Sequence, residues 1–187
     1  METNHHCACH HDDASEQPSR RSFLQRATLA AGITLFGAAA TRPALAGGHT
    51  NTLLLSCMDF RLMDSVEHYM SGRGLVRDYD HIVLAGASLG ALTDKYPAWS
   101  RTFWDHLDVA IQLHGIKKVI VMDHRDCGAY KAILGEDLAA NPQRESEMHR
   151  DHLERLALAI RAKHSSLEVE TLLMSLDGSV ETIGNFA

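Results

Sequence analysis

Cysteine is scarce in this sequence. Its 187 residues contain four cysteines, Cys7, Cys9, Cys57 and Cys127, too few for a disulfide scaffold in a chain of this size. A long basic run is also absent and the formal net charge is −6, which argues against nucleic acid as the main partner. The weakly apolar stretch at residues 27–40 is too short and too rich in Ala and Gly for a stable membrane span. What remains is the composition of an ordinary globular protein, with 45% hydrophobic and 22% charged residues.

The first 46 residues are predicted to be a leader. Residues 1–18 are polar and rich in His and Cys, so they either bind a metal or have no role in the mature protein. The sequence SRRSFLQ at residues 19–25 resembles the twin-arginine export signal, and the apolar stretch and a small-residue A-x-A site ending at Ala46 follow it. A buried helix at residues 27–40 is the alternative, but nothing amphipathic marks it as part of a core. We therefore expect a twin-arginine signal peptide at residues 1–46, cleaved after Ala46, and a periplasmic domain at residues 47–187.

Apolar runs of strand length alternate with segments of helical periodicity after residue 47. Strands are expected at residues 52–56, 81–84, 119–122 and 167–176, with a short antiparallel strand at 179–183. Helices are expected at residues 62–71, 97–114, 129–134 and 143–163, and residues 85–90 are expected to form a Gly-containing loop. This alternation predicts βαβ units and an α/β fold, with a mostly parallel central sheet flanked by helices. No internal repeat or linker divides these residues into two domains.

Polar side chains with metal-binding chemistry follow two of the predicted buried strands. The apolar run at residues 53–55 ends in Ser-Cys-Met-Asp-Phe-Arg, which contains Cys57, Asp59 and Arg61. The run at residues 119–122 ends in Asp-His-Arg-Asp-Cys-Gly, which contains His124 and Cys127. Ligands of open α/β sheets bind at the carboxyl ends of the strands. Two cysteines and one histidine with an open fourth position are typical of a catalytic zinc site.

The paired motifs C-x-D-x-R and H-x-x-C-G, in this order and about this far apart, resemble those of the β-class carbonic anhydrases. The resemblance implies that Cys57, His124 and Cys127 are zinc ligands and that Asp59 and Arg61 form a catalytic dyad. It also implies that the substrates are carbon dioxide and bicarbonate. Finally, it implies a homodimer or higher homo-oligomer, in which the pocket is built across a subunit interface.

The chemistry of these residue types supports the same roles. Two thiolates and a neutral imidazole leave zinc one tetrahedral position for water, and zinc lowers the pKa of that water from 15.7 toward about 7. The zinc-bound hydroxide would attack carbon dioxide to give bicarbonate. Asp59 would accept a hydrogen bond from the hydroxide, and Arg61 would hold Asp59 by two parallel hydrogen bonds. Without Arg61, Asp59 would be free to bind zinc and close the site.

Two other functions stay open on the sequence alone. The family's loop after the second strand reads R-N-A-G, whereas this chain has Val83, Leu84, Ala85 and Gly86. The loss of a charged residue there keeps open a hydrolase for carbonyl sulfide or carbon disulfide, which are linear, apolar analogues of carbon dioxide. The His- and Cys-rich leader motivates a zinc-binding protein without turnover, although such a protein has no use for the Asp59 and Arg61 pair.

The individual site residues also have alternative interpretations. Cys57 and Cys127 could form a disulfide in an oxidising compartment, or Asp59 could complete a purely structural zinc site. Asp123 could orient His124 by accepting a hydrogen bond from its ring. Arg125 and Asp126 are expected to be solvated or paired loop charges.

Overall fold

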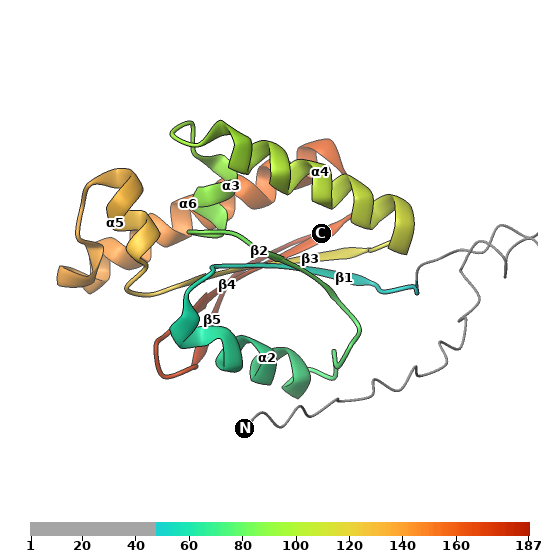
Figure 1. Cartoon of the computed structure of the whole chain (residues 1–187), viewed down its shortest axis with the longest axis horizontal. Coiled ribbons are helices and arrows are strands. Elements are labelled where there is room, and N and C mark those ends of the chain that lie inside the picture. Colours follow the sequence, from blue (N-terminus) through green and yellow to red (C-terminus); the bar gives the residue numbers. More distant parts are fainter. Residues whose placement is uncertain (1–47) are drawn as a thin grey trace, which may run out of the picture. The chain divides into compact units, whose positions relative to one another are not determined.

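Five strands form one sheet in the computed structural model, which describes residues 48–187 (Figure 1). The strands are β1 (Thr52–Ser56), β2 (Asp80–Val83), β3 (Lys118–His124), β4 (Glu168–Met174) and β5 (Val180–Phe186). Their order across the sheet is β2-β1-β3-β4-β5. All neighbouring pairs are parallel except β4 and β5, which are antiparallel. The predicted α/β class, the mostly parallel sheet and the antiparallel last strand are therefore confirmed.

The predicted leader lies outside the described residues. The twin-arginine signal, the cleavage after Ala46 and the periplasmic location stay predictions, as does any role for Cys7 and Cys9. Within residues 48–187, no helix combines the length and the apolar character that crossing a membrane would require.

Helices cover both faces of the sheet. Successive side chains of a strand point to opposite faces, so a strand that is apolar throughout needs cover on both. Leu53 and Leu55 of β1 pack in a core with α4 (Pro97–His114) and α6 (Pro142–Lys163). Leu54, between them, points to the opposite face and packs with Val66 and Met70 of α2 (Met63–Gly72). Figure 1 shows α2 on one side of the sheet and α3, α4 and α6 on the other. Burial on both faces explains why β1 is apolar without alternation.

The ends of the long helices follow the signals in the sequence. Helix α4 begins at Pro97 in its first turn and ends at Gly115, whose φ of 70° is in the left-handed region that favours glycine. Helix α6 begins after Asn141, whose side chain accepts a hydrogen bond from the Arg144 amide at 3.1 Å. The remaining helices are short, namely η1 (Phe60–Leu62), α3 (Ser88–Leu92), α5 (Gly128–Leu134) and η2 (Leu138–Ala140).

Helix α3 corrects one expectation, because part of the predicted loop at residues 85–90 is helical. The segment contains two glycines, which normally indicate a loop. Gly90 is required here for packing: an added Cβ would lie 2.3 Å from the Ala85 carbonyl oxygen and 3.1 Å from the Leu84 side chain. This close approach brings α3 against the end of β2, beside the place where β1 and β3 end.

Candidate metal centre

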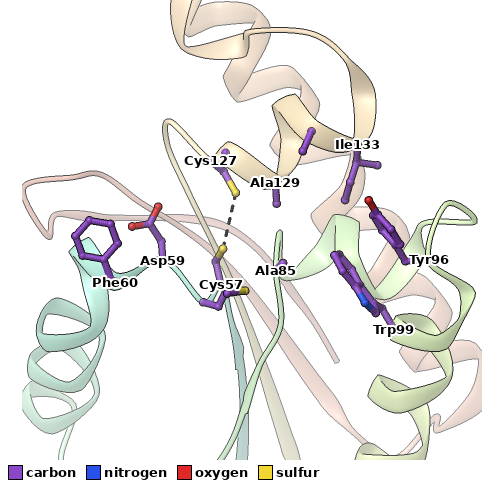
Figure 2. Close-up of a pocket in the computed structure, with 12 residues that line it drawn as sticks. Cys57, Asp59, Phe60, Ala85, Tyr96, Trp99, Cys127, Ala129 and Ile133 are labelled. Atoms are coloured by element: carbon purple, nitrogen blue, oxygen red, sulfur yellow. Dashed lines mark hydrogen bonds between the residues drawn. The ribbon is translucent and has the colours of Figure 1, made fainter.

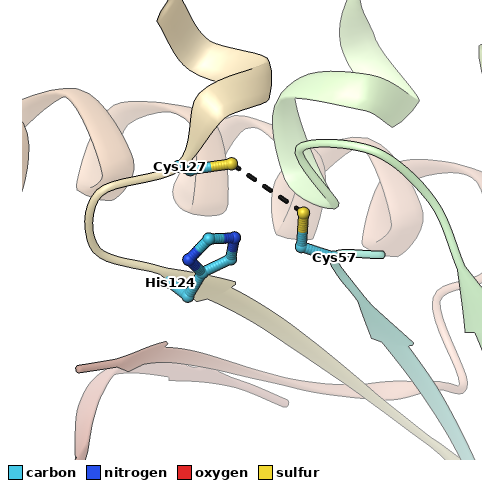
Figure 3. Close-up of side chains that lie close together, drawn as sticks. All are labelled: Cys57, His124 and Cys127. Atoms are coloured by element: carbon cyan, nitrogen blue, oxygen red, sulfur yellow. Dashed lines mark hydrogen bonds between the residues drawn. The ribbon is translucent and has the colours of Figure 1, made fainter. Parts of the chain in front are cut away.

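Cys57, His124 and Cys127 converge on one point, although 70 residues separate the two cysteines. Cys57 follows the last residue of β1, His124 is the last residue of β3, and Cys127 precedes α5. Strands β1 and β3 are parallel neighbours, so their carboxyl ends lie side by side. One donor atom from each of the three side chains lies within 4.8 Å of the others, close enough to hold a single metal ion (Figure 3). The three donor atoms therefore lie together as predicted, whereas their role as zinc ligands stays a prediction.

Both cysteines are buried free thiols, so the disulfide interpretation is wrong. Their sulfur atoms lie 3.8 Å apart, far beyond the roughly 2.05 Å of a disulfide bond. The hydrogen bond with Cys127 lowers the pKa of Cys57 well below the usual thiol range, and the same contact together with burial raises the pKa of Cys127. Hydrogen bonds from His124 and the Gly86 amide also lower the pKa of Cys57, which favours its thiolate, the form that binds metals.

His124 presents a free nitrogen to the two sulfurs. Its Nδ1 lies 2.8 Å from the carbonyl oxygen of Arg125, and because a carbonyl only accepts, Nδ1 carries the proton. Nε2 is buried and has no hydrogen-bond partner among residues 48–187. Burial alone would lower the pKa of His124, but the nearby Cys57 sulfur outweighs burial and raises it. An oriented imidazole with an unpartnered Nε2 fits a metal ligand.

The hypothesis that Asp123 orients His124 is wrong. Successive residues of a strand point to opposite faces, so Asp123 faces α3, α5 and α6. Its Oδ1 accepts a hydrogen bond from the Ser88 amide at 2.9 Å. Its Oδ2 accepts from the hydroxyls of Ser88 and Tyr130 at 2.6 and 2.7 Å, and from His149 Nδ1 at 2.9 Å.

This buried network fixes one negative charge behind the candidate metal centre. Burial alone would raise the pKa of Asp123, but the hydrogen bonds from His149, Ser88 and Tyr130 outweigh it and lower the pKa. The ionised carboxylate therefore joins three helices to β3. Sequence reasoning missed the network, although the strand period alone could have shown that Asp123 and His124 face opposite ways.

A backbone amide also reaches the candidate centre. The Gly86 N–H donates to the Cys57 sulfur at 3.3 Å, which favours the thiolate. Gly86 has a φ of 74°, and an added Cβ would lie 3.2 Å from the Ala129 Cβ, so glycine suits this close approach. Ala85 and Gly86 are the two residues of the loop that match the family's R-N-A-G pattern, whereas Leu84 packs against the core.

Asp59 and Arg61 form the predicted pair beside the three donors. Arg61 Nε donates to Asp59 Oδ1 at 2.9 Å, and Nη2 donates to Oδ2 at 2.7 Å. These hydrogen bonds lower the pKa of Asp59 to about 2. Asp59 Oδ2 lies 3.8 Å from His124 Nε2, which places the carboxylate next to the donors. Arg61 therefore engages both oxygens of Asp59, and the alternative in which Asp59 closes a structural zinc site stays a prediction.

An apolar cavity of about 400 Å³ opens onto two of the three donors, Cys57 and Cys127 (Figure 2). Its walls include Tyr96, Trp99 and Ile133, which lie across the cavity from Asp59 and Phe60. The rings of Tyr96 and Trp99 stack with their centroids 4.2 Å apart. Lys95 Nζ donates to the Ala132 carbonyl at 2.6 Å, which joins the segment before α4 to α5. Among residues 48–187, Asp59 is the only Asp, Glu, Lys or Arg that lines this cavity.

Comparisons with known proteins agree with this geometry. A family model described as "Putative carbonic anhydrase" matches residues 48–184. Uncharacterized proteins of Rickettsia bellii and Rickettsia conorii are each 41% identical over 133 residues, which is 71% of this chain and 81% and 72% of theirs. The Coccomyxa β-carbonic anhydrase, solved in complex with acetazolamide, is alike in fold with a TM-score of 0.52 at 15% identity, covering 76% of each chain. The chain therefore belongs to the carbonic anhydrase family that this family model describes.

Proposed function

We propose that this protein is a zinc enzyme that catalyses the reversible hydration of carbon dioxide to bicarbonate. The observation that supports the proposal most directly is the convergence of Cys57, His124 and Cys127 within 4.8 Å, beside a carboxylate held by Arg61. Two sulfurs and one nitrogen are a ligand set that zinc accepts while it keeps a position open. When bound, zinc would acidify a water molecule and so supply a nucleophile at neutral pH.

The protein's own side chains would orient the reactants. The Asp59 carboxylate is ionised at neutral pH, and its Oδ2 lies 3.8 Å from His124 Nε2. There it can accept a hydrogen bond from the nucleophile and so direct the nucleophile's lone pair at the substrate carbon. Arg61 holds both oxygens of Asp59, which keeps the carboxylate from acting as a fourth ligand. The apolar walls of the cavity suit a neutral, linear molecule such as carbon dioxide and exclude much of the competing water.

Metal analysis combined with a stopped-flow assay of the full-length chain tests this function. We expect zinc in the purified protein and hydration of carbon dioxide well above the buffer rate, lost on chelation and restored by zinc. Zinc binding without any excess over the buffer rate would favour the non-catalytic zinc-binding alternative. Absence of zinc affinity would exclude both the zinc enzyme and the non-catalytic zinc-binding protein.

A hydrolase for carbonyl sulfide or carbon disulfide remains the second proposal. The cavity of about 400 Å³ is lined mainly by apolar side chains, and these substrates are also neutral and linear but larger because of sulfur. Release of hydrogen sulfide from either compound should be compared with carbon dioxide hydration in the same preparation. A higher kcat/KM for the sulfur compound would replace the leading proposal.

We also propose that two copies associate beside the cavity. Met58 and Phe60, which follow β1 at the rim of the cavity, are 62% and 85% exposed, and neighbouring Met63 is 41% exposed. Large apolar side chains that cluster on a surface indicate an interface. A second copy covering this rim would enclose the cavity and agrees with the homodimer implied by the β-class resemblance.

Replacing Phe60 by glutamate should break this association. Burying a phenylalanine side chain contributes about 1.5–3 kcal/mol, and a symmetric dimer buries it twice, so the dissociation constant should rise at least about a hundredfold. Light scattering over a concentration series would measure the change. Leu158→Glu is the matched control, because Leu158 is 59% exposed on α6, on the opposite face of the sheet from α2. A parent protein that is monomeric throughout, or equal weakening by both substitutions, would contradict the proposed interface.

A further inference from the structure

Arg61 is held on two sides, and the second side is not part of the C-x-D-x-R motif. Besides one backbone and two side-chain hydrogen bonds to Asp59, Arg61 donates from Nη1 to Asp126 Oδ2 at 2.7 Å and from Nη2 to the Asp126 carbonyl oxygen at 2.9 Å. Asp59 and Asp126 together raise the pKa of Arg61. The guanidinium therefore links the segment after β1 to the segment after β3, 65 residues further along the chain.

The backbone around Asp126 is shaped for this contact. Asp126 has a φ of 54°, in the left-handed region that Asp and Asn tolerate better than most side chains. Its N–H donates at 2.6 Å to Glu145 Oε1, and Glu145 is a buried residue of α6, only 5% exposed. Helix α6 thus fixes the peptide of Asp126 from one side, while the carbonyl and the carboxylate of the same residue face Arg61 on the other.

We infer that Asp126 is a positioning residue, whose carboxylate holds the Arg61 guanidinium in the orientation that keeps Asp59 away from the metal. The inference rests on the proposed zinc site. It assigns a role to a residue that is neither one of the three candidate zinc ligands nor part of the Asp59 and Arg61 pair. Asp126 sits between His124 and Cys127, so the segment that supplies two metal ligands also restrains the arginine. Any shift of this segment would therefore move the ligands and Arg61 together.

The size of the effect follows from exposure. The side chains of Arg61 and Asp126 are 35% and 48% exposed, so water screens their attraction and the pair is a modest one. Arg61 would also keep its bonds to Asp59 and to the Asp126 carbonyl when the carboxylate is removed. We therefore expect changes of about threefold to fivefold rather than loss of function.

Two substitutions isolate the carboxylate without disturbing the fold. Asp126→Gly removes it and suits a φ of 54°, and Asp126→Asn keeps a neutral oxygen that can accept from Arg61. Asp151→Asn is the matched control, because Asp151 pairs with Arg155 on the exposed side of α6. Each full-length variant would be loaded with cobalt and titrated with thiocyanate, whose binding to the open metal position is followed by visible absorbance. The kcat and KM for carbon dioxide would be measured on the zinc form.

We expect Asp126→Gly to weaken thiocyanate binding about threefold to fivefold and to lower kcat by a similar factor, while KM and metal content stay unchanged. Asp126→Asn should recover part of the loss, and Asp151→Asn should have no effect. In an Arg61→Ala background, Asp126→Gly should have no further effect on thiocyanate binding, since Asp126 acts through Arg61.

Unchanged thiocyanate affinity in Asp126→Gly, or an equal loss with and without Arg61, would overturn the inference. The thiocyanate titration requires no turnover, so it decides the role of Asp126 even if the parent protein fails to hydrate carbon dioxide. If hydration is absent but thiocyanate binding weakens as expected, the proposed function fails and the positioning role of Asp126 stands.

Discussion

Replacing either Cys57 or His124 by alanine is expected to remove zinc and carbon dioxide hydration together. Each variant leaves two of the three donors that converge within 4.8 Å, and an apolar methyl group takes the place of the third. Zinc in catalytic sites is held by three protein ligands, so two should not retain it through purification. Without zinc, water keeps a pKa near 15.7 instead of about 7, and we expect the rate to fall to that of the buffer.

Metal analysis by inductively coupled plasma mass spectrometry, together with stopped-flow hydration, would measure both effects on one sample. His68→Ala is the control for loss of a histidine, because His68 is exposed on α2. A Cys7→Ala and Cys9→Ala double variant is the control for loss of cysteine and also tests whether the leader binds metal. Zinc retained at full stoichiometry in both Cys57→Ala and His124→Ala would contradict the proposed centre, and zinc lost only with Cys7 and Cys9 would move the site to the leader.

The convergence of the three donors was predictable because it depends on short-range signals. Apolar runs mark β1 and β3 as buried strands, and the carboxyl ends of neighbouring parallel strands meet at one edge of the sheet. Cys57 and His124 lie directly at these ends. The sequence does not state that β1 and β3 are neighbours, but the two motifs make sense as one site only if they are.

Contacts between distant segments were less predictable. Asp126 was expected to be a solvated or paired loop charge, and the structure pairs it with Arg61 at 2.7 Å. No sequence pattern identifies Arg61 as the partner of Asp126, because the pairing depends on how the segments after β1 and β3 fold. The Gly86 amide that donates to Cys57 was missed for the same reason, since its direction depends on a left-handed backbone at Gly86 and the packing of α3.

Buried polar groups show the clearest gap between pattern and structure. Asp123 lies in an apolar strand, where an isolated carboxylate would be strongly destabilising. The strand pattern indicates burial at this position but says nothing of its partners, which come from α3, α5 and α6. A buried ionised group with four hydrogen bonds is therefore both a component of the fold and the support for three helices that surround the candidate centre.

Replacing Asp123 by alanine is expected to lower the free energy of unfolding by about 3–5 kcal/mol. The change leaves the Ser88 amide and the side chains of Ser88, Tyr130 and His149 without their shared acceptor, and all of them are buried. Such a loss is a large part of the roughly 5–15 kcal/mol that stabilises a typical domain. Asp123→Asn should cost less, because the hydroxyls can rotate to accept and His149 can move its proton to Nε2.

Urea unfolding of the chelated protein, followed by circular dichroism, would measure these losses without a contribution from bound metal. Asp151→Ala and Asp151→Asn remove the same atoms from an exposed position on α6 and should each change the unfolding free energy by less than about 0.5 kcal/mol. The expected order of stability is therefore the parent and both Asp151 variants first, then Asp123→Asn, then Asp123→Ala. Asp123 precedes His124 on β3 but faces away from it, toward the three helices. Equal stability of Asp123→Ala and Asp151→Ala would mean that the network does not anchor these helices around the candidate metal centre.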